Sequence, residues 1–147
     1  MLTCALLVSV AVGIGFGLLP AVQCSGVEVF VALGGRGLTR TRRMAARRLE
    51  GGGVPTYCTP IAWAEVHAGI RPGEEPMTQE LFEARGEVVI DAAIGRRAGA
   101  YLARYSRSHG VELADALVAS AAATARLHLW TLNRTHYPMP DVRFYQP

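Results

Sequence analysis

Two carboxylates stand in apolar stretches of the sequence, where a charged side chain calls for an explanation. Glu65 lies in the run 63–69, and Asp115 lies near the start of the run 113–119. A glutamate on a helix most often faces solvent, and an acid in the first turn of a helix is favoured by the helix dipole. Each residue therefore has a structural explanation, and both are also candidates for catalysis or metal binding.

Three more polar residues accompany these acids. Glu112 precedes Asp115 by three positions and shares its helical face, so the two form either a metal platform or a charge pair at a helix start. Asn133 directly follows a predicted strand, where sites of α/β proteins gather, although asparagine is also a common turn residue. His136 can bind phosphate, bind a metal or serve the turn at Tyr137.

The first elements that would position these residues alternate between strand and helix. A strand over 54–58 is followed by a helix over 60–70, because Thr59 can cap it and Pro60 suits its first position. A second helix covers 78–84, and a strand covers 87–90.

The later elements continue this alternation. Asp91 can cap a long helix with one apolar face, which ends at His109-Gly110. A helix over 113–126 follows, and strands are predicted over 127–132 and 142–145. The residues expected to face the core of these helices are Ile94, Ala98, Tyr101, Leu102, Tyr105, Leu113, Leu117 and Val118. This order predicts a three-layer α/β domain, in which helices flank a short central parallel sheet.

Composition sets wide limits on function. The chain has 147 residues, which suffice for one ordinary domain. Its net charge is +3, and all fifteen basic residues are arginine. Guanidinium groups suit phosphate recognition, but a GC-rich genome explains an arginine-only chain equally well. The three cysteines show no disulfide or metal spacing, which fits a reducing compartment, and Cys58 is expected to be a core residue.

Residues 1–41 form an atypical segment with three interpretations. The run 2–19 is almost wholly apolar, which suits a membrane anchor or an export signal, although no basic residue occurs before Arg36. The segment can instead supply the first strand and helix of the domain, since buried parallel strands are continuously apolar. It can also result from an altered reading frame upstream of an ordinary domain over 42–147.

Three segments in order resemble successive motifs of PIN-domain ribonucleases of the VapC toxin type. They are Thr59-Pro60-Ile61-Ala62-Trp63-Ala64-Glu65-Val66-His67-Ala68-Gly69, Leu113-Ala114-Asp115-Ala116-Leu117-Val118-Ala119 and Trp130-Thr131-Leu132-Asn133-Arg134-Thr135-His136-Tyr137. The resemblance covers about residues 42–147. It implies a PIN-like fold and an RNA endonuclease that requires Mg²⁺ or Mn²⁺.

The resemblance also assigns roles to particular residues. Glu65 and Asp115 match the second and third acidic positions of the family, and Asn133 matches the fourth, so these three are the expected metal ligands. Arginines around the cleft would hold the RNA backbone, and single-stranded or loop RNA is the expected substrate. The family also implies a cognate antitoxin partner, a homodimer and a cytoplasmic location.

The sequence departs from the family at the first acidic position. Family members have an Asp at the end of the first strand, whereas no Asp occurs here before Asp91, and Glu28 is the only acid before Glu50. Glu28 is therefore the candidate substitute, although its extra methylene would displace a ligand. Three hypotheses follow: an RNA endonuclease toxin impaired by a missing ligand, a catalytically inactive protein that binds the antitoxin, and a membrane-anchored or exported protein.

Overall fold

The centre of the molecule is a parallel sheet of four short strands in the order β3-β2-β1-β4. The computed structural model describes residues 29–31 and 53–146. The strands are β1 (Val29–Val31), β2 (Thr56–Cys58), β3 (Gly86–Glu87) and β4 (His128–Trp130). In the register of the sheet, Phe30 lies between Tyr57 of β2 and Leu129 of β4. The predicted parallel sheet is confirmed.

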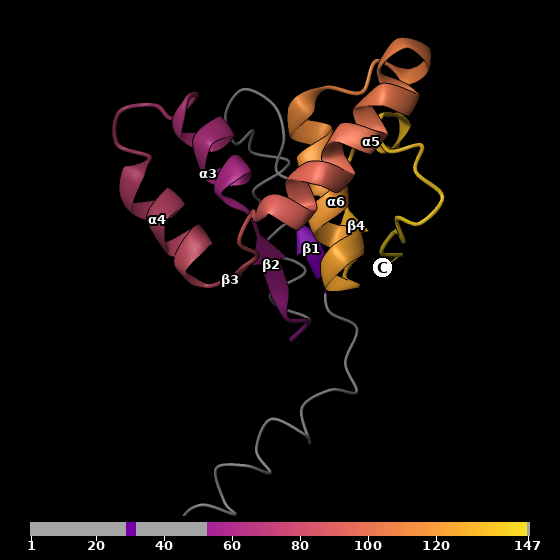
Figure 1. The fold of residues 1–147 in the computed structure, drawn as a ribbon. Helices are drawn as coiled ribbons and strands as arrows, with labels where there is room; N and C mark the ends of the chain where they lie inside the picture. Colours follow the sequence, from indigo (N-terminus) through magenta and orange to yellow (C-terminus); the bar gives the residue numbers. More distant parts are fainter. Residues whose placement is uncertain (1–28, 32–52, 147) are drawn as a thin grey trace, which may run out of the picture.

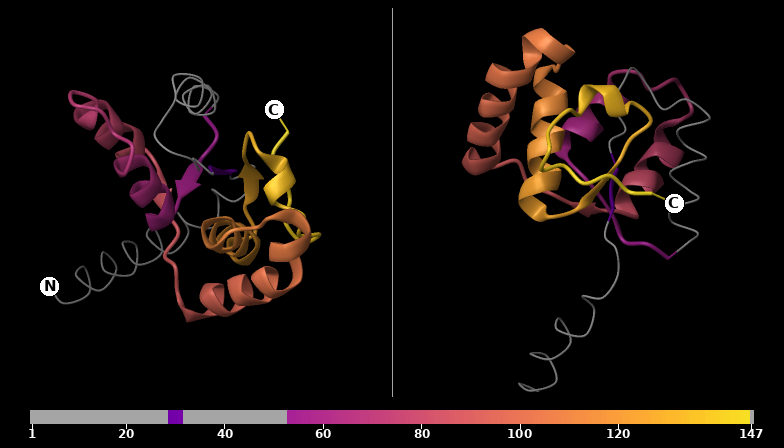
Figure 2. Two further views of the ribbon diagram at one scale, coloured as in Figure 1. Left: turned by 90° about the horizontal axis from the view of Figure 1, so that it is seen from above. Right: turned by 90° about the vertical axis from the view of Figure 1, so that its right-hand side faces the viewer.

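Helices pack on both faces of this sheet (Figures 1 and 2). They are α3 (Pro60–His67), α4 (Glu75–Glu83), α5 (Ala92–His109) and α6 (Leu113–Ala125), and a 3-10 helix, η1, covers Arg134–His136. Successive strand residues point to opposite faces. Tyr57 packs with the core under α5 and α6, whereas the next residue, Cys58, packs with α3 and α4. The predicted three-layer α/β architecture is therefore confirmed.

Local capping signals account for the ends of the long helix α5. The Asp91 carboxylate accepts a hydrogen bond from the backbone N–H of Ile94 at 2.8 Å, which satisfies one of the free donors of the first turn. Gly110 ends the helix at φ 64°, in the left-handed region that glycine adopts without a steric penalty. Both ends of this helix were predicted correctly.

The core under α5 and α6 is built from one face of α5 and nearly the whole circumference of α6. Ile94, Ala98, Tyr101 and Tyr105 are buried on α5, and α6 buries its middle turns from Ala116 to Ala122. A helix that is apolar all round belongs in such a central position. The prediction that Leu113 faces the core is wrong, since Leu113 is 61% exposed. It is the first residue of α6, ahead of the buried stretch that begins at Ala116.

Several elements are shorter than the sequence predicts, whereas α4 begins at Glu75, earlier than the helix expected over 78–84. The helix over 60–70 ends at His67, and the strand expected over 87–90 is instead Gly86–Glu87, which leaves Val89 exposed. The strand expected over 142–145 reduces to one bridge between Leu129 and Phe144. Gly86 must lie close to the ring of Tyr57, because a Cβ added there would lie 2.6 Å from the ring.

Several expectations concern residues outside the described part of the chain. They include the apolar run 2–19, Glu28 and most of the segment 1–41. β1, however, is the inner strand that joins β2 to β4, and it precedes the expected domain boundary at residue 42. The sheet thus includes part of the atypical segment. Within residues 29–31 and 53–146, no helix combines the length and apolar character needed to cross a bilayer.

Candidate active site

Glu65 is positioned by α3, which begins at the carboxyl end of β2. Pro60 fills the first helical position, as predicted. Thr59 occupies the N-cap position with extended backbone angles, but the prediction that its side chain caps the helix is wrong, since its buried hydroxyl makes no capping hydrogen bond. Ala62 and Val66 are buried against the sheet side, and Glu65 is half-buried between them. A carboxylate that is partly withdrawn from water is a stronger candidate for a specific role than a fully exposed one.

Asp115 is positioned by the first turn of α6. Its Oδ2 atom accepts a hydrogen bond from the backbone N–H of Glu112, the N-cap residue, at 3.3 Å. The carboxylate therefore satisfies a donor that the helix leaves free, and the helix dipole favours its negative charge. The side chain of Asp115 is only 19% exposed. Glu112 itself is exposed, and its backbone supplies the observed contact.

His136 reaches Asp115 from the other side, through the turn that follows β4. The backbone N–H of Asn133 donates to the Thr131 hydroxyl at 3.1 Å, and the Thr135 hydroxyl donates to the Asn133 side chain at 2.6 Å. These contacts shape the turn that leads into η1. At the end of η1, the Nδ1 atom of His136 lies 3.3 Å from Oδ2 of Asp115.

The buried hydroxyl of Tyr137 connects the two acids. Burial raises the pKa of Tyr137, and the charges of Asp115 and Glu65 raise it further, together with a hydrogen bond to Asp115. Both carboxylates must therefore lie within electrostatic range of one phenol group, although they come from α3 and α6. We call Glu65, Asp115, His136 and Tyr137 the acidic site.

The sequence-predicted residues are only partly brought together in this site. Glu65, Asp115 and His136 converge on it, whereas the side chain of Asn133 is engaged with Thr135 in the local turn. Glu28 lies outside the described residues and precedes β1 in the chain. The metal-binding roles of Glu65, Asp115 and Asn133 stay predictions.

Tyr137 is the site residue that the sequence analysis did not select. It is 6% exposed and belongs to the core, so its sequence signature is that of an ordinary aromatic residue. Its position next to His136 at the end of the third motif is the one signal that points to the site. Only the folded chain brings its hydroxyl to Asp115.

The acidic site fits a hard divalent cation with few protein ligands. In the described part of the chain, no cluster of three or more His, Cys, Asp or Glu side chains has the geometry to hold a metal. Mg²⁺, however, commonly uses one or two carboxylates and completes its shell with water and substrate phosphate. Glu65 and Asp115 supply two carboxylates that both act on the Tyr137 hydroxyl, and two is the number that such a site commonly uses.

Cys58 is excluded as a catalytic nucleophile. Its side chain is 1% exposed on β2, and it packs with Ala62 and Phe82. Burial raises the pKa of the thiol to about 11, with a smaller opposing effect of Arg85. The thiolate, which is the reactive form, is therefore scarce at neutral pH, and the expected core role is confirmed.

Comparison with known proteins supports the family resemblance. No family model matches the chain. The chain is 35% identical over 86 residues to the proteins named ribonuclease VapC10 from two strains of Mycobacterium tuberculosis, a match that covers 58% of this chain and 65% of each relative. The chain thus spans slightly less than two thirds of the relatives that it matches.

A solved structure shares the fold. A chain of a toxin-antitoxin complex from Klebsiella pneumoniae superposes with a TM-score of 0.56 at 20% identity, covering 78% of this chain and 94% of that one. The similarity at this identity concerns the fold alone, and it agrees with the parallel sheet and flanking helices described above. The sequence match to VapC10 agrees with the three motifs, so the chain is similar in sequence to a VapC-type ribonuclease, and it has a PIN-like α/β fold.

Proposed function

We propose that the protein is a metal-dependent RNA endonuclease, the toxin of a toxin-antitoxin pair. The observation that carries the proposal is the acidic site, where Glu65 of α3 and Asp115 of α6 act on the same buried hydroxyl beside the carboxyl ends of β2 and β4. Ligands of parallel α/β sheets bind at this edge. The similarity to VapC10 supports RNA as the substrate.

Mg²⁺ or Mn²⁺ would be held by Glu65 and Asp115, with Asn133 as the third proposed ligand. When bound, the ion would make an attacking water more acidic and stabilise the negative charge on the scissile phosphate. The protein's own residues orient the ligands. The Glu112 N–H, the His136 ring and the Tyr137 hydroxyl all contact the Asp115 carboxylate, which restricts its rotation.

His136 has a second possible contact, because its side chain is 42% exposed while one ring nitrogen faces Asp115. When Nδ1–H donates to Asp115, the opposite nitrogen, Nε2, is an acceptor and can take a hydrogen bond from a ribose 2′-hydroxyl of RNA that enters the site. A histidine held by a carboxylate has its tautomer fixed by that contact. His136 therefore positions Asp115 and presents a polar group to the substrate.

The proposed toxin would have a protein partner and a defined cellular location. A cognate antitoxin would neutralise the toxin, in line with the toxin-antitoxin complex that shares its fold. The toxin would act in the cytoplasm, where RNA is accessible, and would form a homodimer as its family resemblance implies.

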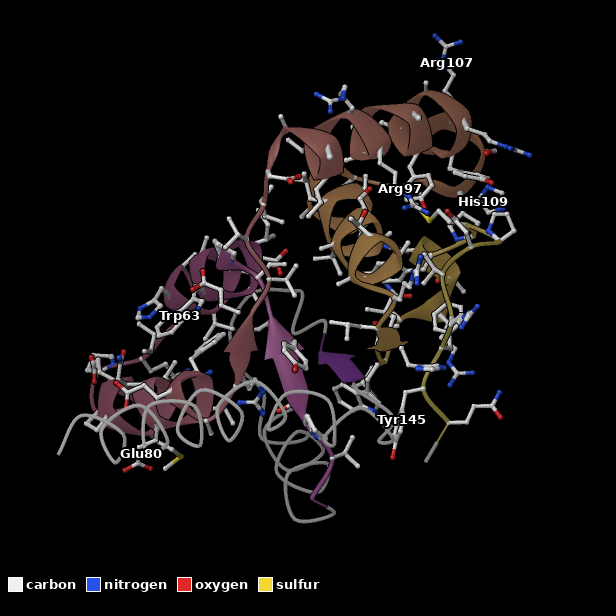
Figure 3. All side chains as sticks on the ribbon, turned by 60° about the horizontal axis from the view of Figure 1, so that its bottom comes forward. Trp63, Glu80, Arg97, Arg107, His109 and Tyr145 are labelled. Carbon is white, nitrogen blue, oxygen red and sulfur yellow. The ribbon has the colours of Figure 1, made fainter. Side chains whose placement is uncertain are left out.

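The decisive test is an RNA cleavage assay with purified protein and a labelled single-stranded RNA. We expect cleavage in Mg²⁺ or Mn²⁺, no cleavage in EDTA, and at least about a hundredfold loss of rate in Glu65→Gln and in Asp115→Asn, because each substitution removes a charged ligand. The matched control is Glu80→Gln, which changes an exposed carboxylate on α4, far from α6 in Figure 3. An active Asp115→Asn protein would refute the assignment of the site.

A second candidate function is an inactive PIN-like protein that still sequesters the antitoxin. The observation that favours it is the absence of any Asp before Asp91, which removes the first acidic position of the family from the sequence. This alternative predicts stable antitoxin binding, no metal-dependent cleavage, and a cellular effect that Asp115→Asn does not change. If Asp115→Asn abolishes toxicity, the alternative is excluded.

A further inference from the structure

The outer face of α5 is a basic surface that the acidic site does not use. Arg96, Arg104 and Arg107 are exposed on this helix, and α5 contains no acidic residue from Ala92 to His109. At 100° per residue, Arg96 and Arg107 lie on the side opposite to the buried face of Ile94, Ala98, Tyr101 and Tyr105, and Arg104 lies on the flank, about a quarter turn from that face. We call Arg96, Arg104 and Arg107 with the small residues between them the α5 face.

These arginines differ from their neighbour Arg97, which has a structural role. Arg97 donates to the Asp141 carboxylate and to the Tyr101 hydroxyl, and so ties α5 to the C-terminal segment. No acid within the described residues pairs with Arg96, Arg104 or Arg107. Figure 3 shows the side chain of Arg107 pointing away from the body of the molecule. Within the described residues, the charges of Arg96 and Arg107 are therefore free for a partner, whereas the guanidinium of Arg104 lies 5.3 Å from the ring centroid of Tyr105 and keeps its outer N–H groups for one.

The space between the arginines is filled by residues with little or no side chain. Gly99, Ala100 and Ala103 are exposed there, and a Cβ added at Gly99 would have no atom within 4 Å. A polymer backbone can therefore approach the helix closely. With a rise of about 1.5 Å per residue, Arg96 and Arg107 stand about 16 Å apart along the axis, which spans several nucleotides of a single strand.

The carboxyl end of α5 lies close to the acidic site along the chain. Residues 110–112 connect α5 to α6, and Asp115 lies in the first turn of α6. The helices pack side by side, so the end of α5 that carries Arg104 and Arg107 lies beside the end of α6 that carries Asp115 (Figure 1). A chain of phosphates held at the α5 face can therefore continue toward the site.

The composition of the α5 face favours a nucleic acid over a protein. Protein interfaces are anchored by large apolar or aromatic side chains. The large hydrophobic residues that are exposed in the described part of the chain are Met77, Val89, Leu113 and Leu132, and none lies on α5. Guanidinium groups instead bind phosphate oxygens in pairs of hydrogen bonds. We propose that the α5 face binds the phosphate backbone of single-stranded RNA and guides it to the acidic site.

The inference rests on the proposed function, which supplies RNA as the ligand. RNA binding is therefore measured separately from RNA cleavage, so that either one can fail alone. The probe is a labelled single-stranded RNA of mixed sequence, about 20 nucleotides long so that it can span both surfaces. Binding is followed by fluorescence anisotropy in EDTA over a range of salt concentrations. The variant is Arg104→Gln with Arg107→Gln, and the matched control is Arg71→Gln with Arg143→Gln, two exposed arginines outside α5.

We expect the slope of log affinity against log salt to become shallower by about 1.4 in the α5 variant, since each phosphate contact contributes about 0.7. That change corresponds to about a tenfold loss of affinity at physiological salt, if the curves converge near 1 M. The control should retain the wild-type slope. Equal loss in both variants would show that only net charge matters and would overturn the inference.

The same variants test whether the α5 face instead binds an acidic partner protein or a second copy of this chain. If the α5 variant keeps its RNA affinity but loses affinity for an acidic partner protein, or changes its oligomeric mass, the face is a protein interface and the inference is wrong. Wild-type protein that binds RNA through α5 but never cleaves it with Mg²⁺ would refute the proposed function alone. Cleavage that persists while the α5 variant binds like the control would refute this inference alone.

Discussion

A hydrogen bond to a carboxylate fixes its orientation, and Asp115 has three such partners in the acidic site. Tyr137 differs from Glu112 and His136 because its donor is buried, so water cannot replace it at once if it is removed. The Tyr137 hydroxyl is not among the expected metal ligands. A conservative substitution that removes only this hydroxyl can therefore test its contact with Asp115.

Tyr137→Phe should keep the ring packing and lose the hydroxyl contact with Asp115. We expect the free energy of unfolding to fall by about 1–2 kcal/mol, since hydrogen bonds to charged groups contribute somewhat more than neutral ones, and Mn²⁺ binding to weaken severalfold because Asp115 is less well oriented. Urea unfolding measures the first effect, and titration of free Mn²⁺ by electron paramagnetic resonance measures the second.

Tyr145→Phe is the matched control for this substitution. Tyr145 is only partly buried, and it contacts Arg134 through its backbone carbonyl rather than its hydroxyl. Its variant should unfold within about 0.5 kcal/mol of the wild type and bind Mn²⁺ unchanged. Equal Mn²⁺ affinity in Tyr137→Phe and the wild type would show that the hydroxyl has only a packing role.

At the scale of the elements, the C-terminal segment is held to α5 by a small polar network. The Tyr101 hydroxyl donates to the Asp141 carboxylate at 2.7 Å, and Arg97 pairs with the same carboxylate. Burial, followed by the hydrogen bond to Asp141, raises the pKa of Tyr101 to about 12. The hydroxyl therefore remains a donor over the whole neutral range.

This network predicts a pH-dependent stability. Partial burial disfavours the charged form of Asp141, but hydrogen bonds from Arg97 and Tyr101 outweigh it and lower the pKa of the carboxyl. Because the folded pKa lies below the unfolded value of about 3.9, the stabilisation is present above that value and is lost as the pH falls through the folded pKa.

Asp141→Asn should therefore lower the free energy of unfolding by about 1 kcal/mol at pH 7, a modest effect because solvent screens this half-exposed pair. The difference from the wild type should shrink as the pH falls below the unfolded value and disappear below the folded pKa of Asp141, where both carry a neutral side chain. Urea unfolding across this range is the measurement. Asp91→Asn is the control, since Asn also caps a helix well, and a constant difference at all pH values would contradict the argument.

The limits of helices were easier to predict from the sequence than the limits of strands. The helix starts at Pro60 and after Asp91 and the stop at Gly110 were predicted correctly, because a proline at the first helical position, an Asp cap and a glycine stop depend on local chemistry. Strand limits were wrong where they depend on a partner strand, as for the strand expected over 87–90, which ends at Glu87. The prediction that Leu113 faces the core was wrong for a related reason, because burial of a first helical residue depends on neighbouring elements.

At the scale of the whole molecule, the sheet depends on a strand that the sequence could not single out. Val-Phe-Val of β1 lies in a long run of apolar and glycine residues, so composition left three interpretations of the first 41 residues open. Strand pairing resolves part of the question, since β1 stands between β2 and β4. The acidic site was more predictable, because its motifs carry Glu65, Asp115 and His136, but the convergence of these residues on Tyr137 arises only from the fold.

A chain reduced to residues 42–147 tests the role of β1. Without β1, the backbone groups of β2 and β4 that face it lose their hydrogen-bond partners, and the two strands stand apart across an open gap. We expect the shortened chain to lack a cooperative urea transition, whereas the full chain shows one. Far-ultraviolet circular dichroism along the titration is the measurement.

The result also bears on the origin of the first segment. If residues 42–147 unfold cooperatively at the same midpoint as the full chain, β1 contributes nothing to stability, and an altered reading frame ahead of a self-sufficient domain becomes the better account. If residues 42–147 do not unfold cooperatively, β1 is an integral strand. The fold is then stable although the sequence lacks the first Asp of the family. Translating the upstream nucleotide sequence in all three frames then shows whether a strand ending in Asp has been displaced, which separates a damaged gene from a protein that uses only two charged ligands.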